Sequence, residues 1–446
     1  MRTDCIIPSA GLSSLKRQKI LGRFDAGAIS SDGGVMLLRE IDRQVVLLDR
    51  ASALIPDPRD PELIEHDQRT LLAQRVLAIA CGWEDLNDHQ QLREDQVYQL
   101  ATDRGIDPQS PLASPPTLCR LENRISAKTC MAINKLFAEL YIESHKDAPP
   151  AQIILDFDAT DDPVHGHQEG RFFHGYYDHY CYLPLYVFAG TQLLWAQLRP
   201  SGIDESRHAW AILAILVKRL RESWPQVKIV LRGDSGFCRW KMLRWCDNHG
   251  VDYIVGLAKN SRLLEAAGAL SQTAKAQFEQ TAEPQRIIGE VDYAAGTWRR
   301  WKQGQRRVIA RIEHNDKGEN PRFILTSLQG DPRMLYQQTY CQRGEMENRI
   351  KEQQMGLFAD RTSCSRFTAN CFRLLLSSLA YVLMETLRRT HLAGTELEKA
   401  QVPTLRLKLL KIGVLVQTSV RRIVLHFSSA FPLQKLVTSI LIPSTA

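Results

Sequence analysis

The chain has 446 residues, of which 44% are hydrophobic and 24% are charged, so it can form two or more units with sizeable cores. Its net charge of +7 is by itself weak evidence for a polyanionic partner. The ten cysteines form no Cys-x-x-Cys pair, which argues against a zinc ribbon and fits a reducing compartment. The sequence shows neither a signal peptide nor the ~18 apolar residues of a membrane span. We therefore expect a cytoplasmic protein without membrane contact.

The first third of the chain is expected to be mainly helical. Helical spacing of apolar residues occurs at 30–44, 67–92 and 114–126, and "HKDAPPAQ" (145–152) has the composition of a linker. We therefore treat residues 1–148 as one N-terminal region. Its helix at 114–126 could lie in a DNA groove or belong to the core, and the sequence does not distinguish these two alternatives.

The pattern then changes to that of an α/β core. Five strands are predicted, at 153–160, 179–190, 192–200, 227–236 and 251–259, with helices at 205–224 and 240–250. Residues 149–260 would thus form the first part of the core. Residues 261–335 alternate like antiparallel hairpins and are predicted to be a β-rich insertion. Residues 336–390 would complete the core with two helices, and 391–446 would form a helical C-terminal region.

Two carboxylates occur in the first predicted strand, "IILDFDAT" (153–160). Because side chains alternate along a strand, Asp156 and Asp158 share one face, while Ile153, Leu155 and Phe157 occupy the other. Two carboxylates on a buried face need a partner or a metal ion. The alternative is that this end of the strand is exposed and both groups are solvated.

A third carboxylate, Asp234, ends the strand "VKIVLRGDSG" (227–236). Functional sites of α/β folds gather at the carboxyl ends of strands, so Asp158 and Asp234 would converge if their strands are neighbours. The alternative is that Asp234 only starts a turn or caps the next helix.

A helical stripe in "RMLYQQTYCQRGEMENRIKEQQMGL" (333–357) contains a fourth carboxylate, Glu347. Residues three, four and seven apart share a helix face, and this stripe comprises Tyr340, Arg343, Glu347, Lys351 and Gln354. The alternative is a solvated charged surface. With Asp158 and Asp234, Glu347 could instead form a carboxylate cluster for Mg²⁺, which prefers oxygen ligands. Paired ions of this kind support phosphodiester chemistry.

These motifs resemble those of bacterial insertion-sequence DDE transposases, which have a ribonuclease-H-like core. The resemblance is carried by "DAT" (158–160), "GDSGF" (233–237) and "YCQRGEME" (340–347). Within this group the chain looks like the branch of insertion sequence thirteen-eighty. Further matches to that branch are "FDAGAISSDGG" (24–34), "GWEDLNDHQQLREDQ" (82–96) and the segment 158–188.

The resemblance implies roles for the marked residues. Asp158, Asp234 and Glu347 would be the catalytic residues and would hold two metal ions in the family manner, Mg²⁺ or, as a substitute, Mn²⁺. Tyr340, Arg343 and Lys351 would bind DNA phosphates, and Asp156 is a secondary candidate that would orient Asp158. In many relatives a lysine follows the glutamate by seven residues; here Gln354 stands at that position, and Lys351 is one turn nearer.

The predicted insertion contains a basic, Trp-containing segment, "WRRWKQGQRR" (298–307). Aromatic side chains stack on unpaired bases while Lys and Arg neutralise phosphates. Because related transposases place a flipped base on an aromatic residue of this insertion, Trp298 and, second, Trp301 are base-stacking candidates. The alternative is a hairpin with one buried Trp and a solvated basic face. In "HGHQEGRFFHGYY" (165–177), the spacing of the histidines fits no zinc site, and we expect a polar hairpin bordering the active site.

The resulting prediction is a ribonuclease-H-like mixed five-stranded α/β fold, interrupted by the insertion and preceded by a mainly helical region that binds terminal inverted repeats. The enzyme would be a nucleoid-associated DNA transposase, a homodimer on paired DNA ends that cleaves and joins DNA strands, including target DNA. Two alternatives are a structure-specific nuclease with the same carboxylates but no joining activity, and a catalytically inactive DNA-binding derivative.

Overall fold

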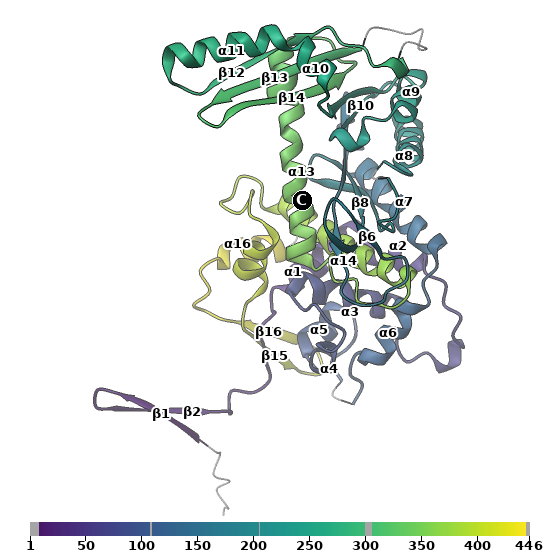
Figure 1. The fold of residues 1–446 in the computed structure, drawn as a ribbon. Coiled ribbons are helices and arrows are strands. Elements are labelled where there is room, and N and C mark those ends of the chain that lie inside the picture. The colour runs from purple at the N-terminus through teal and green to yellow at the C-terminus, as the bar shows by residue number, and fades with distance from the viewer. Residues whose placement is uncertain (1–8, 108, 205, 299–305, 443–446) are drawn as a thin grey trace, which may run out of the picture. The chain divides into compact units, whose positions relative to one another are not determined.

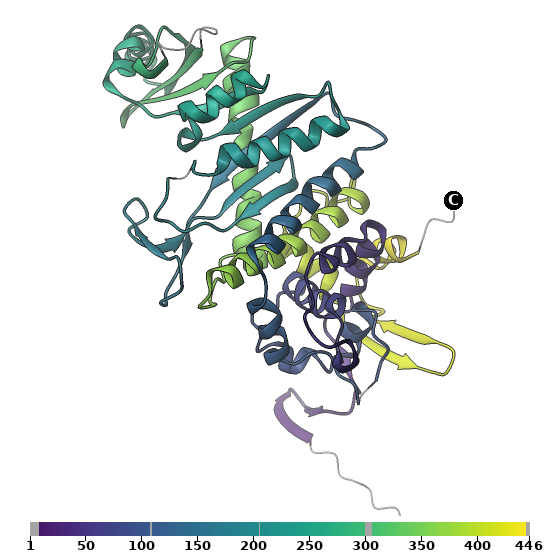
Figure 2. The same cartoon turned by 90° about the vertical axis from the view of Figure 1, so that its right-hand side faces the viewer.

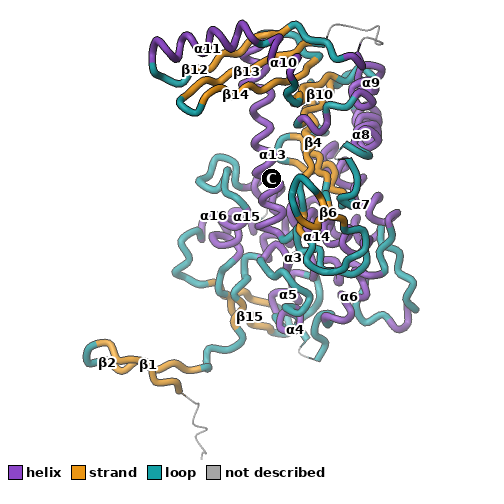
Figure 3. The backbone as a smooth tube through the Cα atoms, in the orientation of Figure 1, coloured by secondary structure: helices purple, strands orange, loops and turns teal. Residues whose placement is uncertain are grey.

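The computed structural model describes residues 9–107, 109–204, 206–298 and 306–442. The chain divides into two compact units. Unit 1 comprises Met1–Ala53, Asp57–Leu121 and Thr386–Ala446, and unit 2 comprises Leu54–Pro56 and Glu122–Glu385. The boundary at 121 differs from the one expected at 148, because the helix α7 (Ala127–Ser144) packs against the sheet of unit 2. Figures 1, 2 and 3 show the elements of each unit.

Unit 1 joins the two ends of the chain. Its main helices near the N-terminus are α1 (Val35–Val45), α2 (Leu47–Ala53), α3 (Gln68–Cys81) and α5 (Gln96–Ala101). The C-terminal segment adds α15 (Val402–Leu405), the π-helical η7 (Arg406–Leu410) and α16 (Gln434–Leu441). It also contains the hairpin β15 (Val414–Thr418) and β16 (Ile423–Phe427), which pairs with β3 (Ile29–Ser30). We had expected the C-terminal region to be helical, but it also contains these two strands.

Two contacts hold the chain ends of unit 1 together. Gly33 and Gly34 donate backbone hydrogen bonds to the carbonyls of Ile412 (2.9 Å) and Leu410 (3.1 Å). A Cβ on Gly34 would lie 2.0 Å from the carbonyl oxygen of Leu409, so only glycine permits this approach. Beside it, the buried carboxylate of Asp32 accepts hydrogen bonds from the neighbouring Ser31 (3.2 Å) and from three side chains distant in the sequence: Trp83 (2.6 Å), Tyr98 (2.9 Å) and Lys411 (2.6 Å).

Unit 2 is built on a mixed sheet of eight strands, with the order β12-β13-β14-β11-β10-β4-β8-β9. The strands β4 (Gln152–Ala159), β8 (Leu185–Ala189), β9 (Gln192–Gln197), β10 (Lys228–Gly233) and β11 (Asp252–Leu257) correspond to the five predicted ones. The strand β4 is parallel to β10, and β10 is parallel to β11. The predicted strand at 179–190 is divided: β7 (His179–Tyr182) belongs to a separate small sheet, because Pro184 cannot donate to a ladder at the break.

The expected five-stranded sheet is larger than predicted because the insertion extends it. The strands β12 (Gln285–Val291), β13 (Arg307–Asn315) and β14 (Gly318–Thr326) continue the sheet beyond β11 in antiparallel pairs. The first part of the insertion is helical rather than β, with α10 (Ser261–Ala266) and α11 (Gly268–Thr281). Figure 1 shows α11 lying along β12 and β13.

Helices cover both faces of this sheet. On one face, Ile153, Leu155 and Phe157 share a core with α7, α8 (Ala209–Ser223) and α9 (Trp240–Asn248). On the other face, Val230 and Ile254 pack against a long helical segment, Pro332–Gly356 (Figure 2). This segment comprises α12 (Pro332–Met334), the π-helical η4 (Leu335–Tyr340), η5 (Cys341–Arg343), α13 (Gly344–Lys351) and the π-helical η6 (Glu352–Gly356).

The helix α14 (Phe367–His391) is the one described helix that is long and apolar enough to cross a membrane by length and composition. Its most apolar stretch has a mean hydropathy of 1.4, and 78% of that stretch is buried inside the protein. It is therefore a core helix, one of the two helices expected in residues 336–390.

Candidate functional site

Asp158 lies near the carboxyl end of β4, on the face of the sheet opposite the core residues Leu155 and Phe157. The strand alternation predicted this placement for Asp156 and Asp158. Neither residue is solvated in the manner of an exposed strand end, because Asp156 is 2% and Asp158 9% exposed. The backbone N–H of Ala159 donates a hydrogen bond to Asp158 Oδ1 at 3.0 Å.

Asp234 follows directly after β10, the parallel neighbour of β4. In the register of this pair Gly233 lies opposite Phe157, so Asp234 and Asp158 are the next residues of two adjacent strands. Asp234 also caps the short helix η2 (Ser235–Phe237), where its Oδ1 accepts a hydrogen bond from the N–H of Gly236 at 2.9 Å. The two interpretations of this residue are therefore compatible: the cap fixes a carboxylate beside Asp158.

Glu347, on α13, is connected to Asp158 through Arg343. The guanidinium group of Arg343 donates to Asp158 Oδ2 at 3.0 Å and to Glu347 Oε1 at 2.7 Å. Arg343 and Glu347 are four residues apart, so they lie on the same helix face. The side chain of Glu347 is 46% exposed. One cation thus lies between a buried carboxylate from the sheet and an accessible carboxylate from the helix.

The electrostatics of the three carboxylates are coupled. Burial raises the pKa of Asp158 to about 7, Arg343 opposes this increase, and the negative charges of Asp234 and Glu347 add to it. The pKa of Arg343 is raised by the carboxylates around it, against the effect of its burial. Asp158 therefore lies in an excess of negative charge that a single guanidinium does not remove.

The donor chemistry of this site fits a hard divalent cation, because all three groups are carboxylates that repel one another. Within the described part of the chain, however, no group of three or more His, Cys, Asp or Glu side chains is close enough to hold a metal ion. The guanidinium of Arg343 occupies the space between Asp158 and Glu347. Joint coordination by these two groups would require Arg343 to move.

A buried ion pair joins the sheet to the helical segment that carries Glu347. Arg232, on β10, lies opposite Asp156 on β4 and donates two hydrogen bonds to its carboxylate. Its remaining Nη1 donates to the backbone carbonyl of Thr339, in the π-helical η4. Sequence reasoning did not identify Arg232, although a charged residue within an apolar strand in "VLRGDSGF" was a signal.

An open cleft of about 400 Å³ lies beside Asp234. Its wall includes Asp234, Tyr340 and Arg343, and two cations that sequence reasoning missed, Lys259 and Arg322. A Cβ on Gly256 would lie 2.9 Å from the hydroxyl of Tyr340 and 2.7 Å from the backbone nitrogen of Ser235, so glycine allows this close packing beside Asp234. The cleft is mainly polar and carries positive charge next to the carboxylates.

The other predicted residues have different environments. Lys351 is exposed on α13, and Gln354 donates to the backbone carbonyl of Asp161 at 2.9 Å. Trp298 is half-buried and packs on the core, with its ring centroid 5.6 Å from that of Tyr293 and a similar distance from the guanidinium carbon of Arg306. Trp301 lies outside the described residues.

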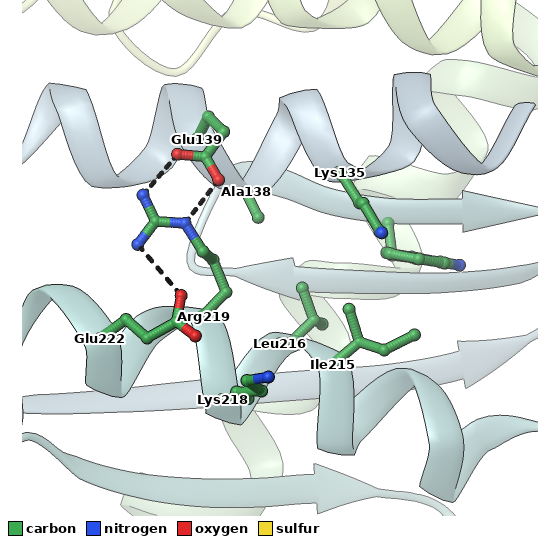
Figure 4. A pocket seen from close by; sticks show the side chains of 9 residues that line it. Lys135, Ala138, Glu139, Ile215, Leu216, Lys218, Arg219 and Glu222 are labelled. Atoms are coloured by element: carbon green, nitrogen blue, oxygen red, sulfur yellow. Dashed lines mark hydrogen bonds and ion pairs between the residues drawn. The ribbon is translucent and has the colours of Figure 1, made fainter. Parts of the chain in front are cut away.

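A second pocket, of about 280 Å³, lies between α7 and α8 (Figure 4). Its floor includes Ala138, Trp195 and Leu216. The guanidinium of Arg219 donates two hydrogen bonds of 2.6 Å to the carboxylate of Glu139 across the pocket. This bidentate pair neutralises the charge of Arg219. The second pocket contains none of the predicted site residues.

Comparisons with known proteins give one family. A family model described as transposase DDE domain group 1 matches residues 12–444. No curated protein matches the chain. Among solved structures, a piggyBac transposase synaptic complex with hairpin DNA matches at 10% identity and a TM-score of 0.39, over 85% of this chain and 80% of that one. The Mos1 transposase paired-end complex with the left transposon end matches at 8% identity and a TM-score of 0.17, over 55% and 72%.

Proposed function

The chain belongs to the transposase family with a group 1 DDE domain, and from this premise we propose that it cleaves and joins DNA at the ends of its own mobile element. The element is an insertion sequence of the thirteen-eighty branch in a bacterium. The enzyme binds the terminal inverted repeats, hydrolyses one strand, and uses the freed 3′-hydroxyl to attack phosphodiester bonds, in the end those of target DNA.

One observation carries this proposal. Asp158 and Asp234 follow one another across two adjacent parallel strands, and Arg343 connects Asp158 with Glu347. Three carboxylates that are 76 and 113 residues apart in the sequence are thus linked, and the contribution of Asp234 and Glu347 to the raised pKa of Asp158 supports their assignment to one site. Structural ion pairs also perturb pKa values, but they do not need three carboxylates for one cation.

The strand order supports a ribonuclease-H-like core. Counted along the chain from β4, the first core strand β4 lies between the second, β8, and the fourth, β10. In such a core the first and fourth strands are neighbours, which gives Asp158 and Asp234 their common edge. The insertion at 261–335 separates the fifth strand, β11, from the helical segment with Glu347.

Asp158, Asp234 and Glu347 are the residues that would hold Mg²⁺, or Mn²⁺ in its place. Two bound ions would activate the attacking oxygen and stabilise the leaving oxygen of the phosphodiester. The chain's own cations bind the substrate: Arg343, Lys259 and Arg322 line the cleft beside Asp234 and can contact phosphates of the DNA backbone. Lys351 lies two turns from Arg343 and extends this phosphate-binding surface along α13.

The test is strand cleavage and joining on a duplex that carries the element's own end, with Mg²⁺, comparing the wild type with Asp234→Asn. We expect Mg²⁺-dependent cleavage and joining that the variant loses while it still binds DNA. Undiminished activity of the variant would show that the cap on η2 is the whole role of Asp234. Hydrolysis without joining of pre-nicked ends would favour the nuclease, and binding without any cleavage would favour the inactive derivative.

A further inference from the structure

An exposed aromatic hairpin lies in the small sheet β5-β7-β6 of unit 2. It consists of β6 (Phe172–His174) and β7 (His179–Tyr182), and β7 pairs also with β5 (Asp162–Pro163). Large aromatic side chains along it are unusually accessible: Phe172 is 50%, Phe173 53%, Tyr176 83% and Tyr180 46% exposed. Of these, Phe173 and Tyr180 share one face of the hairpin, and clustered exposed apolar side chains can mark a binding site.

One face of the hairpin combines aromatic rings with a cation. Phe173 and Tyr180 are direct cross-strand partners, with ring centroids 5.6 Å apart at an angle of 76°. The guanidinium carbon of Arg171 lies 4.5 Å from the centroid of the Tyr180 ring. Arg171 forms no ion pair with a carboxylate in the part of the chain that the structure describes. Its Nη2 lies 2.8 Å from Nδ1 of His167, and since no described carboxylate neutralises the guanidinium, its charge can attract an anionic ligand.

The opposite side of the hairpin is fixed to the protein. Cys181, the partner of Phe172, is buried, and the hydroxyl of Ser201 donates to the carbonyls of both residues at 2.7 and 2.9 Å. The hydroxyl of Tyr182 donates to the carbonyl of Glu169 at 2.7 Å. The aromatic face is thus a preorganised surface on a rigid base.

The hairpin is also connected to the carboxylate site. His179 Nε2 lies 2.9 Å from Asp161 Oδ2, and Asp161 follows Asp158 by three residues. The backbone carbonyl of Asp161 accepts a hydrogen bond from Gln354, which lies two turns beyond Glu347 in the helical segment. His179 lies on the same face of the hairpin as Cys181, opposite to Phe173 and Tyr180, so these contacts hold the base of the hairpin to the chain segment that leaves β4.

We propose that Arg171, Phe173 and Tyr180 form a platform on which unpaired DNA bases stack. The proposal rests on the proposed function, because it gives the transposase a place for the single-stranded DNA that cleavage exposes. Aromatic faces accept any base, and a guanidinium accepts the adjoining phosphate. Trp298, the residue expected in this role, is half-buried against the core and offers less ring surface than Phe173 and Tyr180.

The test measures binding of the full chain to two fluorescein-labelled probes, a twelve-nucleotide oligo(dT) and a blunt duplex of the same length, by fluorescence anisotropy without divalent metal. Loss of stacking for one base weakens binding by about 10-fold. We expect F173A/Y180A to lose about this factor on oligo(dT) and to keep its affinity for the duplex. F173Y/Y180F, which retains both rings, should bind both probes like the wild type.

The matched control is Trp210→Ala, which removes an exposed aromatic side chain on α8 (47% exposed) and should change neither affinity. Wild-type affinity of F173A/Y180A for oligo(dT), or an equal loss on both probes, would overturn the platform. So would a lower self-association of F173A/Y180A in sedimentation velocity with unchanged oligo(dT) binding, because the face would then join two copies of the chain. Ring-dependent oligo(dT) binding by a wild type that shows no Mg²⁺-dependent cleavage would refute the proposed function alone.

Discussion

Arg232 and Asp156 form a buried ion pair between two adjacent strands, with Nη2 of Arg232 2.7 Å from Oδ2 of Asp156. The same guanidinium binds the carbonyl of Thr339, eight residues before Glu347. A π-helical turn leaves its carbonyls in irregular positions, and such turns occur often at functional sites. The pair therefore connects the strands of Asp158 and Asp234 to the helical segment of Glu347.

The contribution of this ion pair to the stability of the protein can be tested separately from its role in positioning the helical segment of Glu347. Asp156→Ala leaves a buried, unpaired guanidinium, and we expect it to lower the free energy of unfolding by about 3–5 kcal/mol. The double variant D156L/R232M removes both charges and should recover most of that stability. It also lacks the contact with Thr339, so its DNA cleavage should stay well below that of the wild type. Urea denaturation and cleavage rates measure the two effects, and full activity of the double variant would contradict the positioning role.

Arg343 should compete with divalent metal for the carboxylates. Its guanidinium lies 3.0 Å from Asp158 and 2.7 Å from Glu347, so Arg343→Gln removes a cation from the space between them. We expect this variant to bind Mn²⁺ several-fold more tightly in isothermal titration calorimetry, because like-charge repulsion at the site is reduced. Its strand cleavage should fall, because a phosphate-binding group is lost.

The control for Arg343→Gln is Lys351→Gln, which removes a positive charge from an exposed position of the same helix. Lys351→Gln should leave Mn²⁺ affinity close to that of the wild type. Equal or weaker Mn²⁺ binding by Arg343→Gln would mean that the guanidinium supports the carboxylate geometry more than it opposes the metal.

Local patterns predicted the parts of the site that depend on one element. The alternation of "IILDFDAT" predicted that Asp156 and Asp158 share a face, and helical spacing predicted that Arg343 and Glu347 do. Both arrangements are found, because period-two and period-3.6 geometry follows from the backbone alone. Whether the strands of Asp158 and Asp234 are neighbours stayed open in the sequence pattern, since periodicity does not specify which strands pair.

The features that sequence reasoning missed depend on contacts between distant segments. The contact of Arg232 with Thr339 joins residues 107 apart in the sequence. The hydrogen bonds of Gly33 and Gly34 to Ile412 and Leu410 join the two ends of the chain. The helices α10 and α11 were missed because the strongly alternating segment after them dominated the prediction for the whole insertion. The pattern of a single segment does not indicate which distant residues it contacts in the folded protein.

Asp162 should make the stability of the protein depend on pH. Burial raises its pKa from 3.8 to about 8, and the neighbouring carboxylates Asp360 and Asp161 add to the increase. At a pH between 3.8 and about 8, Asp162 is protonated in the folded state and ionised in the unfolded chain. The free energy of unfolding therefore falls as the pH rises from about 4 to about 8, by up to about 1.4 kcal/mol per pH unit, and levels off above pH 8.

Asp162→Asn keeps the shape and removes the titration, so its stability relative to the wild type should increase steadily from pH 5 to pH 8. Urea denaturation at each pH measures this difference. The exposed Asp147→Asn is the control, and its difference from the wild type should not vary with pH in this way. Parallel curves for Asp162→Asn and the wild type would show that Asp162 is ionised in the folded protein.

Asp32 should be a main determinant of the stability of unit 1. Its buried carboxylate accepts hydrogen bonds from Trp83, Tyr98 and Lys411, and so joins "SSDGG" (30–34) to the segment 82–98 and to the C-terminal segment. Asp32→Ala leaves the buried hydroxyl of Tyr98 without its acceptor, which costs about 1–3 kcal/mol, and it also removes the acceptor of the partly exposed Trp83 and Lys411. We expect a loss of several kcal/mol in urea denaturation, with the exposed Asp25→Ala unchanged as the control.

The elements that Asp32→Ala destabilises first would show whether its effect is confined to unit 1. Hydrogen exchange should accelerate in α1, α3 and η7, which surround Asp32, before it accelerates in the strands β4 and β10 of unit 2. In the same variant, Asp158, Asp234 and Glu347 keep their own contacts, all of which lie within unit 2. Binding of the element's end should therefore weaken in Asp32→Ala if unit 1 recognises the inverted repeats, while hydrolysis of a short non-specific duplex persists. Loss of both activities together would show that the two units unfold as one.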